Sequence, residues 1–220
     1  MIEKFVNDDC MKIMAKMPDN AVNLTLTDIP YGEVNRNSNG LRNLDKSVAD
    51  IMVFDLEEFL SEVYRVSSST IIIFCGQGQF SDIQKWFQDK QNHNKGTVRQ
   101  LVLRKLNPSP MNGQHIYLSG IENAVWFKKR GGVFNAHCKN TVFDYPCAKK
   151  KYHPTEKPHG LLKELILDNS NENDIVFDPC AGSGSTLLVA RQNNRQYIGC
   201  ELNKYYYDKA KERLEEVKDE

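Results

Sequence analysis

Short apolar runs that alternate with segments of helical spacing constrain the fold of this chain more than any other feature. Runs rich in Val, Ile, Leu, Phe and Thr predict buried strands at 21–27, 70–75, 98–106, 123–129, 175–177 and 197–200. Apolar residues at helical spacing predict helices at 55–66, 80–87, 161–167, 186–192 and 205–217. Because strands that alternate with helices form a mostly parallel sheet covered on both faces, we expect an α/β fold.

Length and composition favour one globular domain that comprises residues 1–220. The chain has 40% hydrophobic and 26% charged residues, which is ordinary for a soluble protein. No apolar run approaches the roughly 20 residues that span a bilayer, and the first residues lack the plan of a signal peptide. We therefore expect a cytoplasmic protein that does not enter a membrane. The cysteines lie apart without CxxC pairs, which predicts free, buried thiols.

The charge is balanced overall but unevenly distributed. The formal net charge of +0 argues against a protein that coats nucleic acid by bulk electrostatics. Between Arg104 and Lys157, however, basic residues far outnumber acidic ones, whereas the stretch up to Glu62 is dominated by acids. The basic middle segment indicates either a local docking face for an anion or a set of solvated lysines, and charge alone favours neither.

A glycine-containing turn after a buried strand indicates a cofactor site. The strand at 175–177 delivers Asp178 to the carboxyl edge of the sheet, and a turn then opens a helix. Gly182 and Gly184 lack side chains that would obstruct a ligand, and the next strand ends at Glu201, which can accept hydrogen bonds from two ribose hydroxyls. Leu187 stands where a dinucleotide fingerprint would have its third glycine. These residues predict a nucleoside cofactor other than a dinucleotide.

A second motif, Thr-Asp-Ile-Pro-Tyr at residues 27–31, follows the strand at 21–27. An exocyclic amino group of a base is a poor nucleophile, and two acceptors aimed at its hydrogens would favour the geometry needed for attack. The side chain of Asp28 and the carbonyl of Ile29 can supply them, while Pro30 restrains the loop and Tyr31 can stack on the base. A base reaches such a pocket only after it leaves the helix, so base flipping is implied.

These two motifs, with His-Pro-Thr-Glu-Lys-Pro at residues 153–158, resemble those of the S-adenosylmethionine-dependent DNA amino-methyltransferases. The order of the motifs is that of the circularly permuted group, and the resemblance covers almost the whole chain. It implies a Rossmann-like fold with a seven-stranded sheet, S-adenosylmethionine as cofactor, DNA as partner, and direct methyl transfer. Asp28 at the start of its motif resembles the adenine-N6 members, with cytosine-N4 as the alternative.

The resemblance also implies roles for individual residues. The segment around the amino-acid part of the cofactor consists of Asp178, Pro179, Cys180, Ala181, Gly182, Ser183 and Gly184. Glu201 would hold the ribose and Asp9 would approach the adenine ring, while Thr155 and Lys157 would help to hold the methionine end. An equally weighted alternative for Asp8 and Asp9 is capping of a helix at 11–17.

One position departs from the common family form Asp-Pro-Pro-Tyr, because Ile29 replaces the first proline. The predicted contact there is a main-chain carbonyl, which a change of side chain can preserve. A less rigid loop is less preorganised. A cofactor-binding or DNA-binding protein with weakened catalysis is therefore the non-enzymatic alternative, and methylation of RNA or of a protein amide is an enzymatic one.

Two other residue sets suggest different chemistry. Pro146-Cys147 and Glu122-Asn123 resemble motifs of cytosine-C5 methyltransferases, but their order along the chain is wrong for that family, so we interpret Cys147 as incidental. His137, Cys138, Cys147 and His153 have spacings that match no compact zinc pattern, and we expect no metal.

Segments 32–48 and 131–152 lack periodicity and are predicted to be loops. Residues 131–152 are short for a target-recognition insert, so we expect either modest sequence specificity or a homodimer. Their aromatic residues, Phe134, Tyr145 and Tyr152, suit either stacking on DNA or anchoring to the core. Circular permutation further predicts that the strand near residues 2–6 and the C-terminal helix are neighbours.

Overall fold

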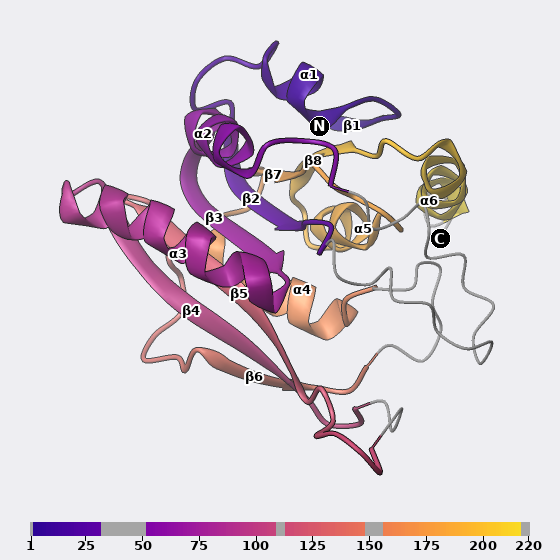
Figure 1. Ribbon diagram of the computed structural model, residues 1–220. Coiled ribbons are helices and arrows are strands. Elements are labelled where there is room, and N and C mark those ends of the chain that lie inside the picture. Colours follow the sequence, from indigo (N-terminus) through magenta and orange to yellow (C-terminus); the bar gives the residue numbers. More distant parts are fainter. Residues whose placement is uncertain (1, 32–51, 109–112, 148–155, 217–220) are drawn as a thin grey trace.

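The computed structural model describes residues 2–31, 52–108, 113–147 and 156–216 (Figure 1). The strands are β1 (Glu3–Val6), β2 (Val22–Asp28), β3 (Ser67–Cys75), β4 (Gly96–Lys105), β5 (Ile121–Lys129), β6 (Val142–Tyr145), β7 (Ile175–Asp178) and β8 (Gln196–Cys200). The helices are α1 (Cys10–Met14), α2 (Leu56–Val66), α3 (Gln77–Asn92), α4 (His159–Asn169), α5 (Ser185–Gln192) and α6 (Lys204–Glu216). The segment 32–48, predicted to be a loop, lies outside the described residues.

The strands form one sheet in the order β1-β8-β7-β2-β3-β5-β4-β6. Only the pairs β3–β5 and β4–β5 are antiparallel, and the other described pairs are parallel. The prediction of an α/β fold with a mostly parallel sheet is confirmed. The sheet has eight strands and not the predicted seven.

The additional strand, β6, lies inside segment 131–152, so the prediction that this whole segment is a loop was wrong. Residues 142–145 extend the sheet edge by pairing in parallel with β4. Phe143 is buried, and the hydroxyl of Tyr145 donates to Glu164 of α4 at 2.6 Å. Anchoring to the core, the second interpretation of this aromatic residue, therefore applies to Tyr145. A four-residue strand with apolar residues at only some positions is too short to give a periodic signal.

Side chains alternate in direction along each strand, which explains why helices cover both faces of the sheet. Leu26 of β2 and Ile72 of β3 belong to one apolar cluster, which also contains buried residues of α4, α5 and α6. Ile71 and Ile73 of the same strand belong to a second cluster, together with buried residues of α1, α2 and α3. Successive residues of a strand point to opposite faces, so one strand supplies both cores. Among the described residues, no helix is both long and apolar enough to cross a membrane.

The first strand and the last helix are neighbours, as circular permutation predicts. β1 pairs in parallel with β8 at the sheet edge, and the Phe5 ring packs on Tyr207 of α6 with ring centroids 4.7 Å apart. Figure 1 shows β1 and α6 on the side of the molecule that carries β8.

All six cysteines are free, as predicted. Cys10, Cys75 and Cys200 are buried, but Cys138 is exposed and the others are half-buried. The expectation of buried thiols therefore holds for only part of the set.

The parallel pairing of β2 with β3 and β7, and of β7 with β8, brings the carboxyl ends of these strands to one edge of the sheet. Asp28 is the last residue of β2 and Asp178 the last of β7. This edge is where open α/β sheets bind ligands.

Gly96 at the start of β4 provides a test of the packing of the β4–β5 hairpin. A Cβ at this position would lie 2.3 Å from the Lys128 carbonyl oxygen and 2.5 Å from Cζ of Phe127. We expect Gly96→Ala to lower the free energy of unfolding by about 1–3 kcal/mol, because the backbone carbonyl cannot move aside. Chemical denaturation measures this change. Gly120→Ala is the control, since its Cβ would have no neighbour closer than 3.9 Å, and an equal effect of both changes would contradict the prediction.

Candidate functional site

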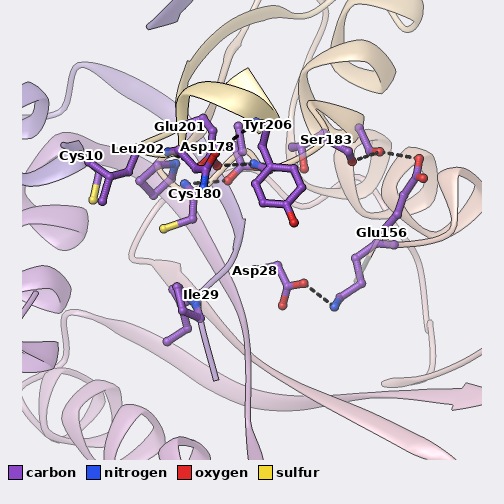
Figure 2. Close-up of a pocket in the computed structure, with 18 of the residues that line it drawn as sticks. Cys10, Asp28, Ile29, Glu156, Asp178, Cys180, Ser183, Glu201, Leu202 and Tyr206 are labelled. Atoms are coloured by element: carbon purple, nitrogen blue, oxygen red, sulfur yellow. Dashed lines mark hydrogen bonds and ion pairs between the residues drawn. The ribbon is translucent and has the colours of Figure 1, made fainter. Parts of the chain in front are cut away.

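The carboxyl edge of the sheet carries a cavity of about 320 Å³ (Figure 2). Its wall combines segments that lie far apart in the sequence and meet only in the folded chain. The described residues that line it are Asp8, Asp9, Cys10, Asp28, Ile29, Pro30, Tyr31, Val53, Phe54, Glu156, Lys157, Leu162, Asp178, Pro179, Cys180, Ala181, Gly182, Ser183, Ser185, Thr186, Glu201, Leu202, Asn203 and Tyr206. Both sequence motifs therefore contribute to one cavity.

The turn between β7 and α5 forms one wall of the cavity. Gly182 and Gly184 have φ values of 50° and 70°, which glycine adopts without strain. Gly184 is not among the described residues that line the cavity, so its predicted contact with the cofactor lacks support from this structure. A Cβ on Gly184 would lie 3.2 Å from Cβ of Ala210 in α6. Glycine is therefore required there by backbone conformation and by the close approach of α6.

Glu201 follows β8, and backbone donors orient its carboxylate. The N–H of Gly182 donates to Oε2 at 2.9 Å, and the N–H of Asn203 donates to Oε1 at 2.7 Å. The N–H of Glu201 itself donates to the Val6 carbonyl at 3.0 Å, so β1 fixes the end of β8. Burial raises the pKa of Glu201, against these hydrogen bonds. Each carboxylate oxygen has further acceptor capacity for ligand hydroxyls.

Asp178 is buried at the end of β7, with its side chain on the cavity. Its Oδ1 accepts from the N–H of Cys180 at 3.1 Å. Burial raises the pKa of Asp178 to about 7, and the hydrogen bonds from Thr186 and Cys180 oppose this rise. Figure 2 shows Asp178 and Glu201 in one group of side chains, with Asp28 in a second group.

Asp9 caps a helix and also lies on the cavity wall. Its carboxylate accepts from the N–H of Met11 at 2.9 Å and so caps α1, which spans only residues 10–14 and not the predicted 11–17. Both Asp8 and Asp9 also line the cavity. Capping therefore positions the Asp9 carboxylate at the cavity wall.

Asp28, at the end of β2, is bonded through both of its carboxylate oxygens. The hydroxyl of Tyr31 donates to Oδ1 at 2.7 Å, and the ammonium of Lys157 donates to Oδ2 at 2.6 Å. The same ammonium lies 3.1 Å from the Tyr31 hydroxyl and 3.0 Å from Oε2 of Glu122. Lys157 was predicted to help hold the methionine end of a cofactor. It lines the cavity, and its Nζ contacts Asp28, Tyr31 and Glu122.

The pKa values around Asp28 describe a buried group of alternating charges. Burial raises the pKa of Asp28, and Lys157 opposes that rise. Burial would lower the pKa of Lys157, but Asp28, Tyr31 and Glu122 together raise it well above its ordinary value. Burial likewise raises the pKa of the Tyr31 hydroxyl. Lys157 is therefore an ammonium at neutral pH, and Tyr31 is a neutral donor.

Ile29 compensates for the missing proline in two ways. Its N–H donates to the Phe74 carbonyl at 3.2 Å and extends the β2–β3 pairing by one residue, which proline cannot do. Its side chain is 1% exposed and packs in the cluster beneath α1 and α2. Beyond it, the Pro30 carbonyl accepts from the side chain of Gln79 at 2.8 Å. Ile29 and Pro30 are thus held by sheet pairing, by burial and by the contact with Gln79.

Most of the predicted site residues are brought together, and several others were missed. Of the predicted set, Thr155 lies outside the described residues and Gly184 is not on the cavity wall. Sequence reasoning did not predict that Phe54, Leu202 and Tyr206 line the cavity. Leu202 directly follows Glu201, so its position after a strand end could have predicted that it lines the cavity. Phe54 precedes α2 with no motif around it, and only folding reveals its position.

The alternative chemistries find no support at the cavity. Cys147 does not belong to the described wall, and its N–H donates to the side chain of Asn107 at 2.6 Å. In the part of the chain that the structure describes, no group of three or more His, Cys, Asp or Glu side chains is placed to hold a metal ion. His153 lies outside the described residues.

The basic middle segment is partly neutralised by acids of the folded chain. Its ion pairs include Arg104–Asp144, Lys105–Glu122, Lys139–Glu164 and Lys157–Asp28. These acids offset part of the positive charge of the segment, and Lys149–Lys151 lie outside the described residues.

The DNA methylase family model N6_N4_Mtase matches residues 22–212. This chain belongs to the N6/N4 DNA methylase family. The type II methyltransferase M.HpaI of Haemophilus parainfluenzae is 30% identical over 244 residues, which are 98% of this chain and 75% of that relative. The crystal structure of the M1.HpyAVI–SAM complex is 26% identical, with a TM-score of 0.73, over 97% of this chain and 100% of that chain.

The fold is also that of PvuII DNA methyltransferase, described as cytosine-N4-specific. That structure is 16% identical, with a TM-score of 0.73, and the match covers 100% of this chain and 91% of that chain. The likeness shows the fold alone. The protein is thus a DNA methyltransferase of the N6/N4 family with a Rossmann-like methyltransferase fold, and its cofactor is S-adenosylmethionine.

The cavity fits S-adenosylmethionine, a cation that carries a ribose and an amino acid. Its volume lies within the range of roughly 300–1,000 Å³ that is common for small-molecule sites. Among its described residues, the only lysine is Lys157, against the carboxylates of Asp8, Asp9, Asp28, Glu156, Asp178 and Glu201. An acidic cavity favours a sulfonium cation over its neutral thioether product.

Asp178 gives this site a pH-dependent effect on stability. Its folded pKa of about 7 lies above the unfolded value near 3.8, so the folded protein binds this proton more tightly. The stability that this group contributes is fully present below about pH 4 and is lost as the pH rises through about 7.

We expect the stability of Asp178→Asn relative to the wild type to increase by about 1.4 kcal/mol per pH unit across this window. Urea denaturation between pH 4.5 and 8 measures it. Asp82→Asn, an exposed change on α3, should show no such trend, and a trend-free Asp178→Asn would contradict the assignment.

Proposed function

We propose that this DNA methyltransferase transfers a methyl group from S-adenosylmethionine to the N6 amino group of adenine after base flipping. The observation that carries the proposal is that Asp28 faces the same cavity as Asp178 and Glu201. An acceptor for an amino group and a binding wall for a nucleoside cofactor are thus adjacent. The electrophilic methyl group comes from the bound cofactor, and the residues of the chain orient the two reactants.

The cofactor wall supports binding through Glu201 and the β7–α5 turn. We infer that Glu201 accepts hydrogen bonds from the ribose hydroxyls, since its carboxylate is already oriented by the N–H groups of Gly182 and Asn203. The turn residues Asp178 to Ser183 and the carboxylate of Asp9 complete this wall. Phe54, Leu202 and Tyr206 supply apolar surface for the adenine ring and the methionine chain.

The base would be oriented by acceptors at the end of β2. We infer that Asp28 accepts one amino hydrogen and the carbonyl of Ile29 accepts the other, which localises the nitrogen lone pair toward the methyl group. The β2–β3 pairing holds Ile29, and the side chain of Gln79 holds Pro30, so these acceptors are preorganised. Tyr31, which lines the same cavity, would stack on the entering base.

Cytosine-N4 methylation is the second candidate, since the N4 amino group would meet the same acceptors. Asp28 at the start of its motif favours adenine by resemblance to the adenine-N6 members. Nucleoside analysis of the methylated product distinguishes the two bases directly.

The test is transfer of labelled methyl from S-adenosylmethionine to unmethylated genomic DNA, followed by nucleoside analysis. We expect N6-methyladenine from the wild type. Asp28→Ala should lower the rate about 100-fold or more, since it removes a preorganised partner of the reacting group, and should leave cofactor binding largely intact. Asp82→Ala on α3 is the matched control and should retain full activity. Cofactor binding without methyl transfer by the wild type would favour the non-enzymatic alternative, and competition with RNA would reveal another substrate.

Glu201 provides a separate test of the cofactor wall. Glu201→Gln loses the negative charge and replaces one acceptor oxygen by a donor, so we expect S-adenosylmethionine to bind about 10- to 100-fold more weakly. Isothermal titration calorimetry measures the change. Glu215→Gln is the control. Glu215 is exposed on α6 and does not line the cavity, so this change should leave the affinity for S-adenosylmethionine unaltered. An unaltered affinity of Glu201→Gln would refute the assigned role.

A further inference from the structure

Glu122 is a half-buried acid that contacts Lys157, which in turn contacts Asp28. It is the second residue of β5 and does not belong to the described wall of the cavity. Its Oε1 lies 2.9 Å from Nζ of Lys105 on β4, and its Oε2 lies 3.0 Å from Nζ of Lys157. Burial would raise the pKa of Glu122, but Lys157 and Lys105 lower it to about 2. It is therefore a carboxylate shared by two ammonium groups.

When a base enters the cavity, its amino group competes with the present hydrogen-bond donors for the Asp28 carboxylate. Both of its carboxylate oxygens are already bonded, Oδ1 to the Tyr31 hydroxyl and Oδ2 to the Lys157 ammonium. Each oxygen can accept a further hydrogen bond, but an amino group that approaches Asp28 from the cavity competes with these donors for the charge of the carboxylate. An ammonium is the stronger competitor, because its hydrogen bond to a carboxylate is charge-assisted.

Displacement of Lys157 would be prohibitive if Asp28 were its only anion. The Lys157 side chain is 7% exposed, and a buried cation that loses its partner is strongly unfavourable. The second carboxylate, Glu122, lies within 3.0 Å of the same nitrogen. Lys157 can therefore give up Asp28 and keep a complete ion pair without moving into water.

We propose that Glu122 is a positioning residue that retains the Lys157 ammonium while the target amino group replaces it at Asp28. In the absence of DNA, Lys157 opposes the effect of burial on Asp28 and orients its carboxylate. During base entry, Glu122 would hold the Lys157 ammonium. Lys105 fixes Glu122 from its other side. The inference rests on the proposed function, in which Asp28 accepts from the base.

The charges of the cluster show what a change at Glu122 would do. Lys105 and Lys157 are balanced by Glu122 and Asp28, so Glu122→Gln leaves an excess positive charge beside the acceptor. Lys157 would then depend on Asp28 alone and bind it more tightly. The base would compete less well, whereas the cofactor wall, which does not include Glu122, would be unaffected.

The experiment measures steady-state methyl transfer to DNA by Glu122→Gln at saturating cofactor. We expect KM for DNA to rise, and kcat/KM to fall about tenfold or more, with the affinity for S-adenosylmethionine unchanged. Glu62→Gln is the matched control, because Glu62 also pairs with a cation, Arg65 at 2.7 Å, but lies on α2 away from the cavity wall. Lys105→Met is the second variant. It keeps the Glu122 carboxylate but removes its support, so a smaller fall in the same direction is expected even if Glu122→Gln does not fold.

A double variant separates positioning from a structural role of β5. In the Lys157→Met background there is no cation to retain, so adding Glu122→Gln should change kcat/KM by less than twofold. An equal loss in both backgrounds, or an unchanged kcat/KM in the single variant, would overturn the inference.

Comparison with the wild type identifies which idea has failed. No methyl transfer by the wild type, or full activity of Asp28→Ala, overturns the proposed function and this inference with it. Asp28-dependent activity that is insensitive to Glu122 overturns the inference alone.

Discussion

The parallel pairing of β2 with β7 is the contact on which the site depends. Leu24 lies opposite Val176 and Thr25 opposite Phe177, in the middle of the sheet. This register places Asp28 and Asp178 at the same edge, although a long stretch of chain separates them. The acceptor for the base and the wall for the cofactor are parts of one rigid surface for this reason. Helices on both faces bury the strands and leave that edge as the place where polar groups meet a ligand.

The charged groups at this edge of the sheet have two functions, to favour a cationic cofactor and to keep a buried carboxylate paired. The cavity carries more carboxylates than cations among its described residues, which suits a positively charged methyl donor. A carboxylate that accepts from an amino group must also remain ionised in a buried position, and burial works against that. Lys157 counters burial at Asp28, and Glu122 in turn satisfies Lys157. The buried charges therefore form a chain in which each group has a partner of opposite sign, as buried ions require.

The sequence predicted the fold class and most of the cavity wall, because both depend on local patterns. Apolar runs identify strands, and residues at strand ends meet at one edge. Asp28, Asp178 and Glu201 were predicted from these positions together with the motifs around them. Side-chain partners between distant segments leave no such pattern. The contact of Lys157 with Asp28 was missed because the resemblance assigned it to the cofactor. The packing of Ile29 was missed because its neighbours come from other elements of the fold.

The packing of Gly184 against Ala210 has a consequence for the order in which the parts of the site form during synthesis. The cofactor turn contacts α6, and Arg213 of that helix also bonds Ser185 at 3.0 Å. Because β2 precedes α6 along the chain, the strand that carries Asp28 is synthesised before the helix that supports the cofactor turn. A nascent chain that ends before α6 therefore lacks the contact of Ala210 with Gly184, and its cofactor turn has no support from that side.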